Sequence, residues 1–425
     1  MNRFVAREVV HLAGVAPGAE QHEVARLLAD ARALADACRL DPVADLGIGE
    51  VHVPELDLLL PARTAGSSSA VRDRGPAALA AEALEADRHL RARCEAALTD
   101  YLPRTRRTRG DRAREVQERL DAELETIAVL GFAGYFLTVA EVVDLITGMD
   151  VRVAARGSGA GSLVNHLLGI SGVDPLAHGL LMERFLSPLR RALPDIDVDV
   201  ESARRTEVYE RILERFGGER CACVSMRDTY RVRHAVRDVG AALGMPPGEI
   251  DAFATAFPHI RARDARNALQ ELPELRASGL GRLAARGELD GFLTLVEALD
   301  GLPRHIALHP CGVLLSDATL LDRTPVEASW MGFPMSQFDK DDVEELGLLK
   351  LDVLGIRMQS SMAYALTEIE RVDGETVDLD AVPHDDEATF ALIKSAHTLG
   401  CFQIESPGQR ELVGKFAPET FGDLI

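Results

Sequence analysis

Two acidic clusters, far apart in the sequence, restrict the possible folds of this chain. Residues 194–200 read PDIDVDV, and residues 349–355 read LKLDVLG. Side chains in a β-strand alternate between its two faces. The first segment therefore predicts a strand with a buried apolar face and an acidic face. The apolar face consists of Ile196, Val198 and Val200, and the acidic face of Asp195, Asp197 and Asp199.

The second segment places Asp352 alone in an apolar run that also predicts a strand. A carboxylate on a buried strand is costly unless a partner neutralises it. A divalent cation shared with the first acidic cluster would be such a partner. Carboxylates that hold two Mg²⁺ ions about 4 Å apart are the usual apparatus of phosphoryl and nucleotidyl transfer. The two segments together predict a site for Mg²⁺ and that class of chemistry.

Composition sets broad limits on what the chain is. It has 425 residues, of which 47% are apolar and 27% charged, as expected for a soluble globular protein of two to four domains. No run of about 18 apolar residues and no signal peptide is visible, which favours a cytoplasmic protein. The six cysteines are scattered without zinc-ligand spacing, so we expect free thiols.

The net charge of −21 argues against a basic protein that coats DNA. It still permits an enzyme that binds nucleic acid through a local basic groove. A basic stretch at residues 104–109 precedes a charged helix and indicates either a solvated helix entrance or a phosphate contact. Lys350 lies inside the second acidic cluster, in a chain whose basic residues are nearly all Arg, which is a hint that an ammonium is needed there.

The order of predicted elements indicates an α/β unit that is interrupted by a helical insertion. Helices are expected at 20–40, 76–100 and 111–129, with a linker at 64–75; helix and strand alternate over 130–200; residues 203–300 are mostly helical; strands return over 305–355; and 358–425 are helical. The two acidic clusters fall on the two separated parts of the α/β unit. The insertion therefore need not keep them apart in space.

A glycine-rich segment, RGSGAGS at residues 156–162, follows a predicted strand and opens a predicted helix. Small residues allow backbone N–H groups to approach an anion, and a helix N-terminus favours negative charge. Arg156 and Ser158 are suited to phosphate binding. The segment is neither a Walker A loop nor a clean dinucleotide fingerprint. Taken alone it indicates either a tight helix entry with Ser162 as the N-cap or a triphosphate site.

A series of longer motifs resembles the bacterial C-family DNA polymerases, that is, the alpha subunit of DNA polymerase III in its replicative or error-prone branch. The resemblance covers roughly residues 28–425. Its motifs occur in this order: GFAGYFLTVAEVV, RGSGAGSLV, ERFLSP, PDIDVDV, TYRVRHAVRDVGAALG, GLPRHIALHPCGVLLS, QFDKDDVEELGLLKLDVLGIR and GCFQIESPGQ. The resemblance implies a DNA-directed DNA polymerase that uses Mg²⁺, primer-template DNA and deoxynucleoside triphosphates. It also implies a sliding clamp and other polymerase subunits as partners, through regions outside this chain.

The resemblance further implies a polymerase beta-like nucleotidyltransferase palm that is split by a helical thumb. The implied boundaries are a PHP tail and connection at 1–124, palm at 125–226 and 308–357, thumb at 227–307, and the start of the fingers at 358–425. The implied catalytic and metal-binding residues are Asp195, Asp197 and Asp352, with Asp199 secondary. The implied nucleotide- and phosphate-binding residues are Arg156, Gly157, Ser158, Arg184 and Lys350, while Gln337 and Lys340 are expected to line the same side of the palm.

Both ends of the chain depart from the family pattern, which predicts a truncated polymerase. Residues 1–60 lack the metal-ligand signature of a PHP domain, so exonuclease activity of that kind is not expected, and relatives continue beyond GDLI at 422–425. Three functions remain open. The first is a templated polymerase, the second is a non-catalytic remnant that binds DNA or other subunits, and the third, less favoured, is a template-free nucleotidyltransferase.

Overall fold

The computed structural model describes the chain except for residues 1–20, 44, 61–75, 105–108, 190–192 and 425. The predicted linker at 64–75 and most of the basic stretch at 104–109 lie outside the described residues. The chain divides into two units, residues 1–50 with 345–347, and the remainder. The described part of the first unit contains helix α2 (Gln21–Ala37), as the sequence predicted. The second unit holds all the predicted site residues.

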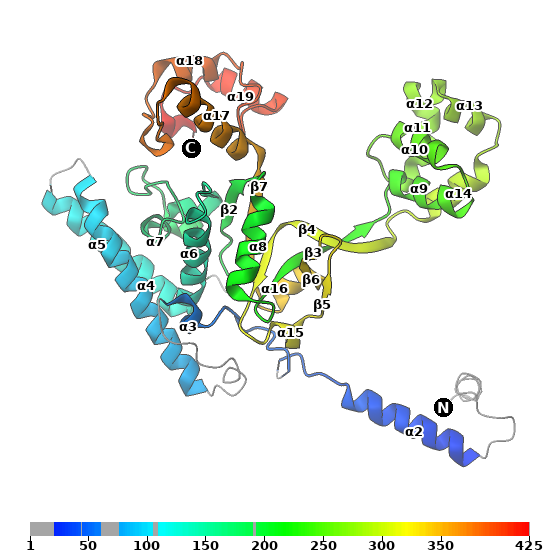
Figure 1. Cartoon of the computed structure of the whole chain (residues 1–425), viewed down its shortest axis with the longest axis horizontal. Coiled ribbons are helices and arrows are strands. Elements are labelled where there is room, and N and C mark those ends of the chain that lie inside the picture. The colour runs from blue at the N-terminus through cyan, green and yellow to red at the C-terminus, as the bar shows by residue number, and fades with distance from the viewer. Residues whose placement is uncertain (1–20, 44, 61–75, 105–108, 190–192, 425) are drawn as a thin grey trace. The chain divides into compact units, whose positions relative to one another are not determined.

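A seven-stranded mixed sheet forms the framework of the second unit, with strand order β1-β2-β7-β4-β3-β6-β5 (Figure 1). Pairing is parallel between β2 and β7 and between β3 and β6, and antiparallel elsewhere. The strands are β1 (Ala154–Arg156), β2 (Asp197–Glu201), β3 (Cys221–Thr229), β4 (Pro303–Leu315), β5 (Val326–Ala328), β6 (Pro334–Asp339) and β7 (Leu349–Ile356).

The two acidic segments are neighbouring strands of this sheet, as their position on either side of the insertion predicted. Val198 and Val200 of β2 are fully buried, which confirms the apolar face. The prediction was wrong in one respect, because β2 begins at Asp197 and Asp195 precedes it. β1 is the strand that was predicted to precede the glycine-rich segment, and β3 lies in a region that the sequence indicated to be mostly helical.

The helices that precede and follow β1 and β2 in the sequence form the main core together with the sheet. These are α3 (Leu56–Leu59), α4 (Pro76–Arg104), α5 (Arg109–Leu130), α6 (Ala133–Thr147), α7 (Leu163–Leu167) and α8 (Arg205–Phe216). Their apolar residues form one cluster with those of β2, β3, β4 and β7. Helix α6 contributes a continuous apolar surface that includes Tyr135, Phe136 and Val139, all of them buried. The sheet that carries the acidic strands is therefore supported from its apolar face.

The helical insertion has a core of its own. Its elements are α9 (Val232–Ala242), α10 (Pro247–Ala256), η4 (Ala262–Asp264), α11 (Ala265–Glu271), α12 (Pro273–Ala277), α13 (Gly279–Ala285) and α14 (Asp290–Ala298). Their buried residues form a second cluster, separate from that of the sheet. The insertion leaves at the end of β3 and returns at the start of β4, where Thr229 is paired with Pro303 (Figure 1).

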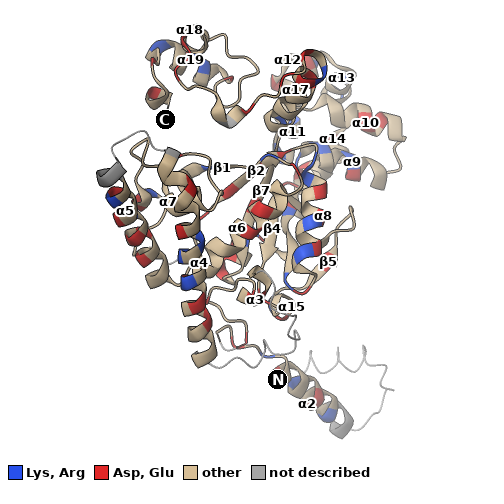
Figure 2. Ribbon diagram, turned by 60° about the vertical axis from the view of Figure 1, so that its left-hand side comes forward, with Lys and Arg blue, Asp and Glu red and all other residues tan. Residues whose placement is uncertain are grey.

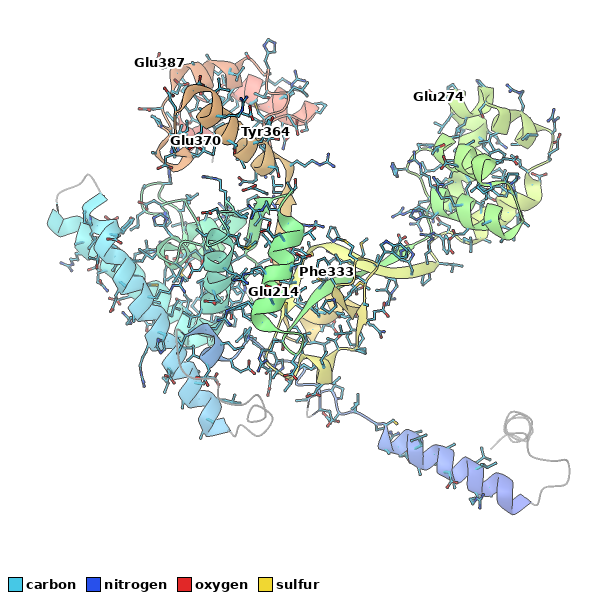
Figure 3. All side chains as sticks on the ribbon, in the orientation of Figure 1. Glu214, Glu274, Phe333, Tyr364, Glu370 and Glu387 are labelled. Atoms are coloured by element: carbon cyan, nitrogen blue, oxygen red, sulfur yellow. The ribbon has the colours of Figure 1, made fainter. Side chains whose placement is uncertain are left out.

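The last part of the chain is helical and has little core. It contains α17 (Arg357–Asp373), η5 (Leu379–Ala381), α18 (Glu387–Lys394), α19 (Pro407–Phe416) and η6 (Phe421–Leu424). Phe390, Ile393 and Val413 are its buried apolar side chains among the described residues. Tyr364 on α17, in contrast, is 68% exposed (Figure 3). Much of the apolar surface of this segment therefore faces outward.

No single helix among the described residues is long and apolar enough to cross a membrane. Segments Ala113–Leu130 and Ala133–Thr147 pass that test only when taken together, and a bend of 112° separates them. The second segment is α6, which belongs to the core described above.

A buried ionic contact ties the segment before α3 to the sheet unit. Asp317, after β4, lies 3.6 Å from the His52 Nδ1 atom and 3.3 Å from Arg323 Nη1. Burial alone would raise the pKa of Asp317, but hydrogen bonds from His52 and Thr319 and the charge of Arg323 hold the pKa well below its ordinary value of 3.8. The ionised form is thus favoured in the folded chain.

We expect Asp317→Asn to lower the free energy of unfolding at pH 7 by about 1–3 kcal/mol, because charge-assisted hydrogen bonds are lost. A depressed pKa stabilises the fold above the ordinary value of 3.8 and loses that effect as pH falls toward the folded pKa. The difference from wild type should therefore narrow between pH 5 and pH 2 in urea unfolding. Asp385→Asn, at an exposed loop position, is the control. A gap that stays constant with pH would contradict this account.

Candidate metal centre

Three carboxylates, two on the neighbouring strands β2 and β7 and one just before β2, meet at one point of the sheet. Carboxylate oxygens of Asp195, Asp197 and Asp352 all lie within 4.8 Å of one another. Asp197 on β2 is directly paired with Asp352 on β7 in the parallel ladder, so both side chains point to the same face. Asp195 is exposed just before β2 and reaches the same point. The structure therefore brings together the three residues that the sequence predicted as catalytic carboxylates.

Two buried tyrosines hold the backbone beside these carboxylates. Tyr135 on α6 donates a hydrogen bond of 2.7 Å from its hydroxyl to the carbonyl of Pro194, immediately before Asp195. Tyr209 on α8 donates one of 3.0 Å to the carbonyl of Val353, immediately after Asp352. Each hydroxyl thus anchors one acidic segment to the helical layer. The sequence analysis identified neither tyrosine as part of the site.

The carboxylates repel one another in the absence of a cation. Burial raises the pKa of Asp197, and the charges of Asp195 and Asp352 raise it further, while Arg156 and Lys350 oppose the shift. Lys350, two residues from Asp352, donates a 2.8 Å hydrogen bond from Nζ to the Asp352 Oδ1 atom. Burial alone would lower the pKa of Lys350, but its bond to Asp352 raises it. One ammonium therefore compensates part of the negative charge.

The donor set fits a hard divalent cation. Mg²⁺ binds one or two carboxylates, retains several waters and shares substrate phosphates. The half-exposed Asp197 and the exposed Asp195 leave room for such ligands next to Asp352. Burial and, after it, the charges of Asp195 and Asp352 raise the pKa of Asp197, and a bound cation would oppose that shift. This acidic triad can therefore hold a metal ion.

Asp199 is excluded from the triad, although it lies on the same strand. It is 2% exposed, and one of its carboxylate oxygens lies 2.6 Å from the Arg156 Nε atom. Burial raises the pKa of Asp199, and Arg156 opposes that shift. Arg156 Nη2 is 4.0 Å from Asp197. The predicted acidic face of β2 is thus divided between a metal-binding group and a buried ion pair.

The glycine-rich segment forms a 3₁₀ turn, η2 (Gly157–Gly161), between β1 and α7. Gly157 has φ +80°, a conformation that favours glycine. A Cβ on Gly161 would lie 2.6 Å from the carbonyl oxygen of Leu181, so the turn packs tightly against the backbone before η3 (Met182–Arg184). Ser158 is exposed on this turn and Arg184 is exposed on η3. Two of the predicted phosphate ligands therefore lie on adjoining turns.

The N-terminus of α7 is occupied by a side chain, which favours a capped helix entry, one of the two alternatives left open by the sequence, at this terminus. Ser162 is the N-cap, as predicted, and accepts a hydrogen bond from the Asn165 N–H group. The buried carboxylate of Glu123 on α5 accepts hydrogen bonds from the Leu163 and Val164 N–H groups and from the Ser162 hydroxyl. These donors cannot also bind a phosphate. Any anion at this loop must be held by side chains and by the turn itself.

Glu123 consequently fixes the loop from beneath. Its Oε1 atom lies 2.5 Å from the Arg119 Nε atom, and Arg119 also donates a 2.9 Å hydrogen bond to the Gly161 carbonyl. The sequence analysis missed both residues, because their contacts with the loop join positions that are 39 or more residues apart in the sequence. Arg119 and Glu123 are spaced i, i+4 on a charged helix. This spacing did not indicate that Glu123 is buried.

We expect Glu123→Gln to lower the free energy of unfolding by about 1–3 kcal/mol, because a buried charged acceptor of three hydrogen bonds is replaced by a weaker one. Glu125→Gln, at an exposed position on the same helix, is the matched control and should change stability by less than about 0.5 kcal/mol. Urea unfolding measures both. Equal effects of the two variants would show that the cap contributes nothing specific.

Gly312 on β4 is another functional position that the sequence analysis missed. It is paired with Asp352 across the antiparallel β4–β7 ladder. A Cβ at this position would lie 2.1 Å from the carbonyl oxygen of Leu351 and 2.9 Å from the Asp352 Cα atom. Only glycine allows β4 to approach the backbone that carries the third carboxylate so closely.

Gly312→Ala should therefore displace β7 at Asp352, lower the free energy of unfolding by about 1–3 kcal/mol and weaken Mn²⁺ binding. Gly172→Ala is the matched control, because nothing lies within 4 Å of a Cβ there. Urea unfolding and Mn²⁺ titration monitored by electron paramagnetic resonance measure the two effects. A Gly312→Ala variant as stable as the control would refute the close-packing argument.

Cys311 and His309, on the same strand, complete the buried side of the site. The Cys311 N–H group donates a 3.2 Å hydrogen bond to His309 Nδ1. Burial, together with the charge of Asp352, raises the pKa of the Cys311 thiol to about 12, so the thiol stays protonated. Burial lowers the pKa of His309. These groups are neutral surroundings for Asp352 and leave Lys350 as its basic partner.

Gln337 and Lys340 are engaged elsewhere. Gln337 on β6 donates a 3.1 Å hydrogen bond to Glu327 of the neighbouring strand β5, and the Lys340 Nζ atom is 2.6 Å from Asp341. Neither contact involves the carboxylate triad. Their expected place at the site stays a prediction.

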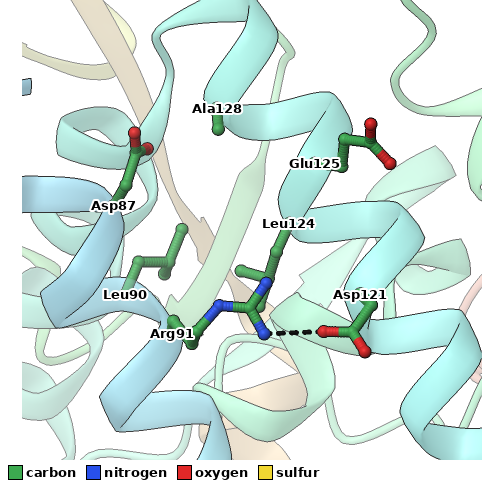
Figure 4. A pocket seen from close by; sticks show the side chains of 7 residues that line it. All are labelled: Asp87, Leu90, Arg91, Asp121, Leu124, Glu125 and Ala128. Atoms are coloured by element: carbon green, nitrogen blue, oxygen red, sulfur yellow. Dashed lines mark hydrogen bonds and ion pairs between the residues drawn. The ribbon is translucent and has the colours of Figure 1, made fainter. Parts of the chain in front are cut away.

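A pocket between α4 and α5 has a volume of about 390 Å³ and contains none of the predicted site residues (Figure 4). Across it Arg91 forms an ion pair of 2.6 Å with Asp121. Asp87 lies on α4, on the same side of the pocket as Arg91, and burial raises the pKa of Asp87. The ion pair thus links α4 and α5. None of the residues that line the pocket belongs to the metal centre.

Sequence comparison agrees with this geometry. Residues 88–355 match the family described as the bacterial DNA polymerase III alpha NTPase domain, and residues 358–425 match the finger domain of that alpha subunit. The chain belongs to the bacterial DNA polymerase III alpha family. The first match contains both acidic strands and the whole helical insertion, and the second begins one residue after the start of α17. The resemblance identified from the motifs is thereby confirmed.

Curated relatives of this family member are error-prone DNA polymerases. Those from Pseudomonas paraeruginosa, Symbiobacterium thermophilum and Nocardia farcinica are 39%, 36% and 37% identical to it over 316, 311 and 308 residues. The alignments cover 73%, 73% and 72% of this chain but only 30%, 28% and 25% of the relatives. The chain thus spans less than a third of the length of these relatives.

Proposed function

We propose that this chain carries the catalytic centre of a DNA-directed DNA polymerase of the C family. The observation that carries the proposal is the meeting of Asp195, Asp197 and Asp352 within 4.8 Å, from strands that a long helical insertion separates in sequence. An arrangement of this kind has no structural reason without a cation, because three carboxylates at this distance repel one another. Membership of the family supports nucleotidyl transfer as the use of that cation.

The proposed domain assignment keeps the boundaries that the resemblance implies, of which 125 falls inside α5, 226 inside β3 and 308 inside β4. The sheet with α6 and α8 is the palm, at 125–226 and 308–357, the helical insertion is the thumb, at 227–307, and the fingers begin at 358. The palm is proposed to be of the polymerase beta-like nucleotidyltransferase type. The separate cores of the sheet and the insertion, and the start of the finger match at residue 358, support these boundaries.

In the proposed reaction, Asp195, Asp197 and Asp352 would hold the Mg²⁺ ions. Bound Mg²⁺ supplies a lowered pKa at the primer 3′-hydroxyl and charge stabilisation of the departing pyrophosphate. Lys350 orients the Asp352 carboxylate through its 2.8 Å hydrogen bond. Arg156, Ser158 and Arg184, with the backbone of Gly157, compensate phosphate charge at the edge of the site.

The substrates would be primer-template DNA and deoxynucleoside triphosphates. Acidic and basic residues are interspersed along α4, α5 and α8, so the net charge of −21 does not prevent local contact with a polyanion (Figure 2). A sliding clamp and other polymerase subunits are also proposed as partners. They would bind regions that the longer relatives contain in addition to the part aligned with this chain. The curated relatives favour the error-prone branch, and hence synthesis during repair or across lesions.

Primer extension on a primed template with Mg²⁺ tests this proposal. Wild type should extend the primer, and Asp352→Asn should lower the rate by at least about 100-fold, the effect expected for a group that binds the metal. Asp100→Asn, at an exposed position on α4, is the control. Extension by Asp352→Asn at the wild-type rate would refute the assignment of the site.

The alternative function, a remnant that binds DNA or other subunits without turnover, predicts a different pattern. Its motivation is the coverage of less than a third of the curated relatives. A wild-type chain that is folded and binds primer-template DNA, yet shows neither extension nor Asp352-dependent Mn²⁺ binding, would favour this alternative.

A further inference from the structure

Asp199 and Arg156 form an ion pair beside the metal centre. The roles proposed for the metal-binding residues do not account for this pair. Asp199 is two residues beyond Asp197 on β2, so the two side chains share a face of the strand. Asp199 is nevertheless 2% exposed, and it does not belong to the group of carboxylates that lie within 4.8 Å of one another. Its contact is with the guanidinium group of Arg156, 2.6 Å from Nε.

The pairing restrains a long side chain at the end of a short strand. β1 consists of three residues, and Arg156 is its last, directly before Gly157 with φ +80°. An arginine side chain at such a place has several rotamers, which a ligand would otherwise have to order at its own expense in affinity. The Asp199 Oδ2 atom lies 2.6 Å from Nε as an ion pair, although within the described part of the chain the Nε–H group makes no hydrogen bond. One terminal nitrogen, Nη2, lies 4.0 Å from the Asp197 Oδ2 atom.

The burial of Asp199 also disfavours separation of the ion pair. The Oδ1 atom of Asp199 is buried and, within the described part of the chain, accepts no hydrogen bond. A buried carboxylate of this kind is strongly disfavoured if its cationic partner leaves. Arg156 is therefore held in place even though 32% of its side chain is exposed. The exposed portion is available to an anion at the carboxylate triad.

We infer that Asp199 is a positioning residue, which holds the Arg156 guanidinium in advance where the triphosphate of an incoming nucleotide binds, and that it is not a metal ligand. The inference rests on the proposed function, since it requires that a triphosphate binds at this centre. It assigns different roles to two aspartates of one strand face. Asp197 binds metal, and Asp199 acts through Arg156.

Loss of the Asp199 charge and loss of its contact with Arg156 should have opposite effects on triphosphate binding, so Asp199→Asn distinguishes the two. Removing a negative charge near the site should strengthen binding of a triphosphate if charge alone mattered. Loss of the Arg156 anchor should instead weaken it. We expect Asp199→Asn to bind dATP, in the presence of Mn²⁺, about 10- to 100-fold more weakly than wild type, in calorimetric titration of the whole chain. Binding at or above wild-type affinity would overturn the inference.

Binding of Mn²⁺ alone separates the two aspartates. Measured by electron paramagnetic resonance, Asp199→Asn should retain the wild-type affinity within about twofold, whereas Asp197→Asn should lose at least about tenfold. If Asp199→Asn lost Mn²⁺ as Asp197→Asn does, Asp199 would be a metal ligand and the inference would be wrong. A merely structural role would lower the unfolding temperature of Asp199→Asn without this split between metal and nucleotide binding.

Arg156→Lys provides a second route that leaves the buried carboxylate paired with a cation. Lysine keeps the charge but loses the planar fork, so dATP binding should weaken while Mn²⁺ affinity is unchanged. In the double variant, Asp199→Asn should add little to Arg156→Lys, because both act through one group. Fully additive losses would contradict the inference. Failure of the proposed function would appear differently, as a wild-type chain that binds neither Mn²⁺ nor dATP, and it would overturn this inference as well.

Discussion

The parallel pairing of β2 with β7 is the constraint on which the rest of the site depends. It places Asp197 directly opposite Asp352, at the distance of neighbouring strands, where two carboxylates repel each other. The surrounding residues compensate for that repulsion. Lys350 bonds to Asp352, Arg156 lies near Asp197, and the backbone on each side is fixed by a tyrosine hydroxyl. The same few atoms therefore determine both the stability of the fold at this point and its capacity to bind a cation.

The sequence predicted those parts of the fold and site whose signal is local. Alternation in PDIDVDV identified the buried face of β2, and the position of both acidic segments outside the helical stretch predicted that they meet. It could not predict that β2 begins only at Asp197, since the pattern is the same on either side of that boundary. Nor did it identify β3, whose apolar run of cysteines, alanine and valine lies within a mostly helical region.

Features that depend on distant contacts were beyond reach of local patterns. Glu123 resembles any solvated glutamate of a charged helix, yet it is 1% exposed and occupies the N-terminus of α7. The same burial removed the helix terminus from the predicted phosphate site. Asp199 continues the alternation of Asp195 and Asp197, and only the three-dimensional position of Arg156 reveals its different environment. Periodicity gives the face of a strand, but not the partner that each side chain finds there.

The attachment of the helical insertion explains how so long an interruption can leave the metal centre intact. β3 and β4 are paired from Cys221–Leu315 to Thr229–Pro303, so the chain leaves and re-enters the sheet through one antiparallel ladder. The cost of closing a loop grows only with the logarithm of its length, and the insertion buries its own apolar residues. Its sequence is therefore largely decoupled from the sheet. The position of Asp352 depends instead on the β4–β7 contact at Gly312, where no side chain can be added.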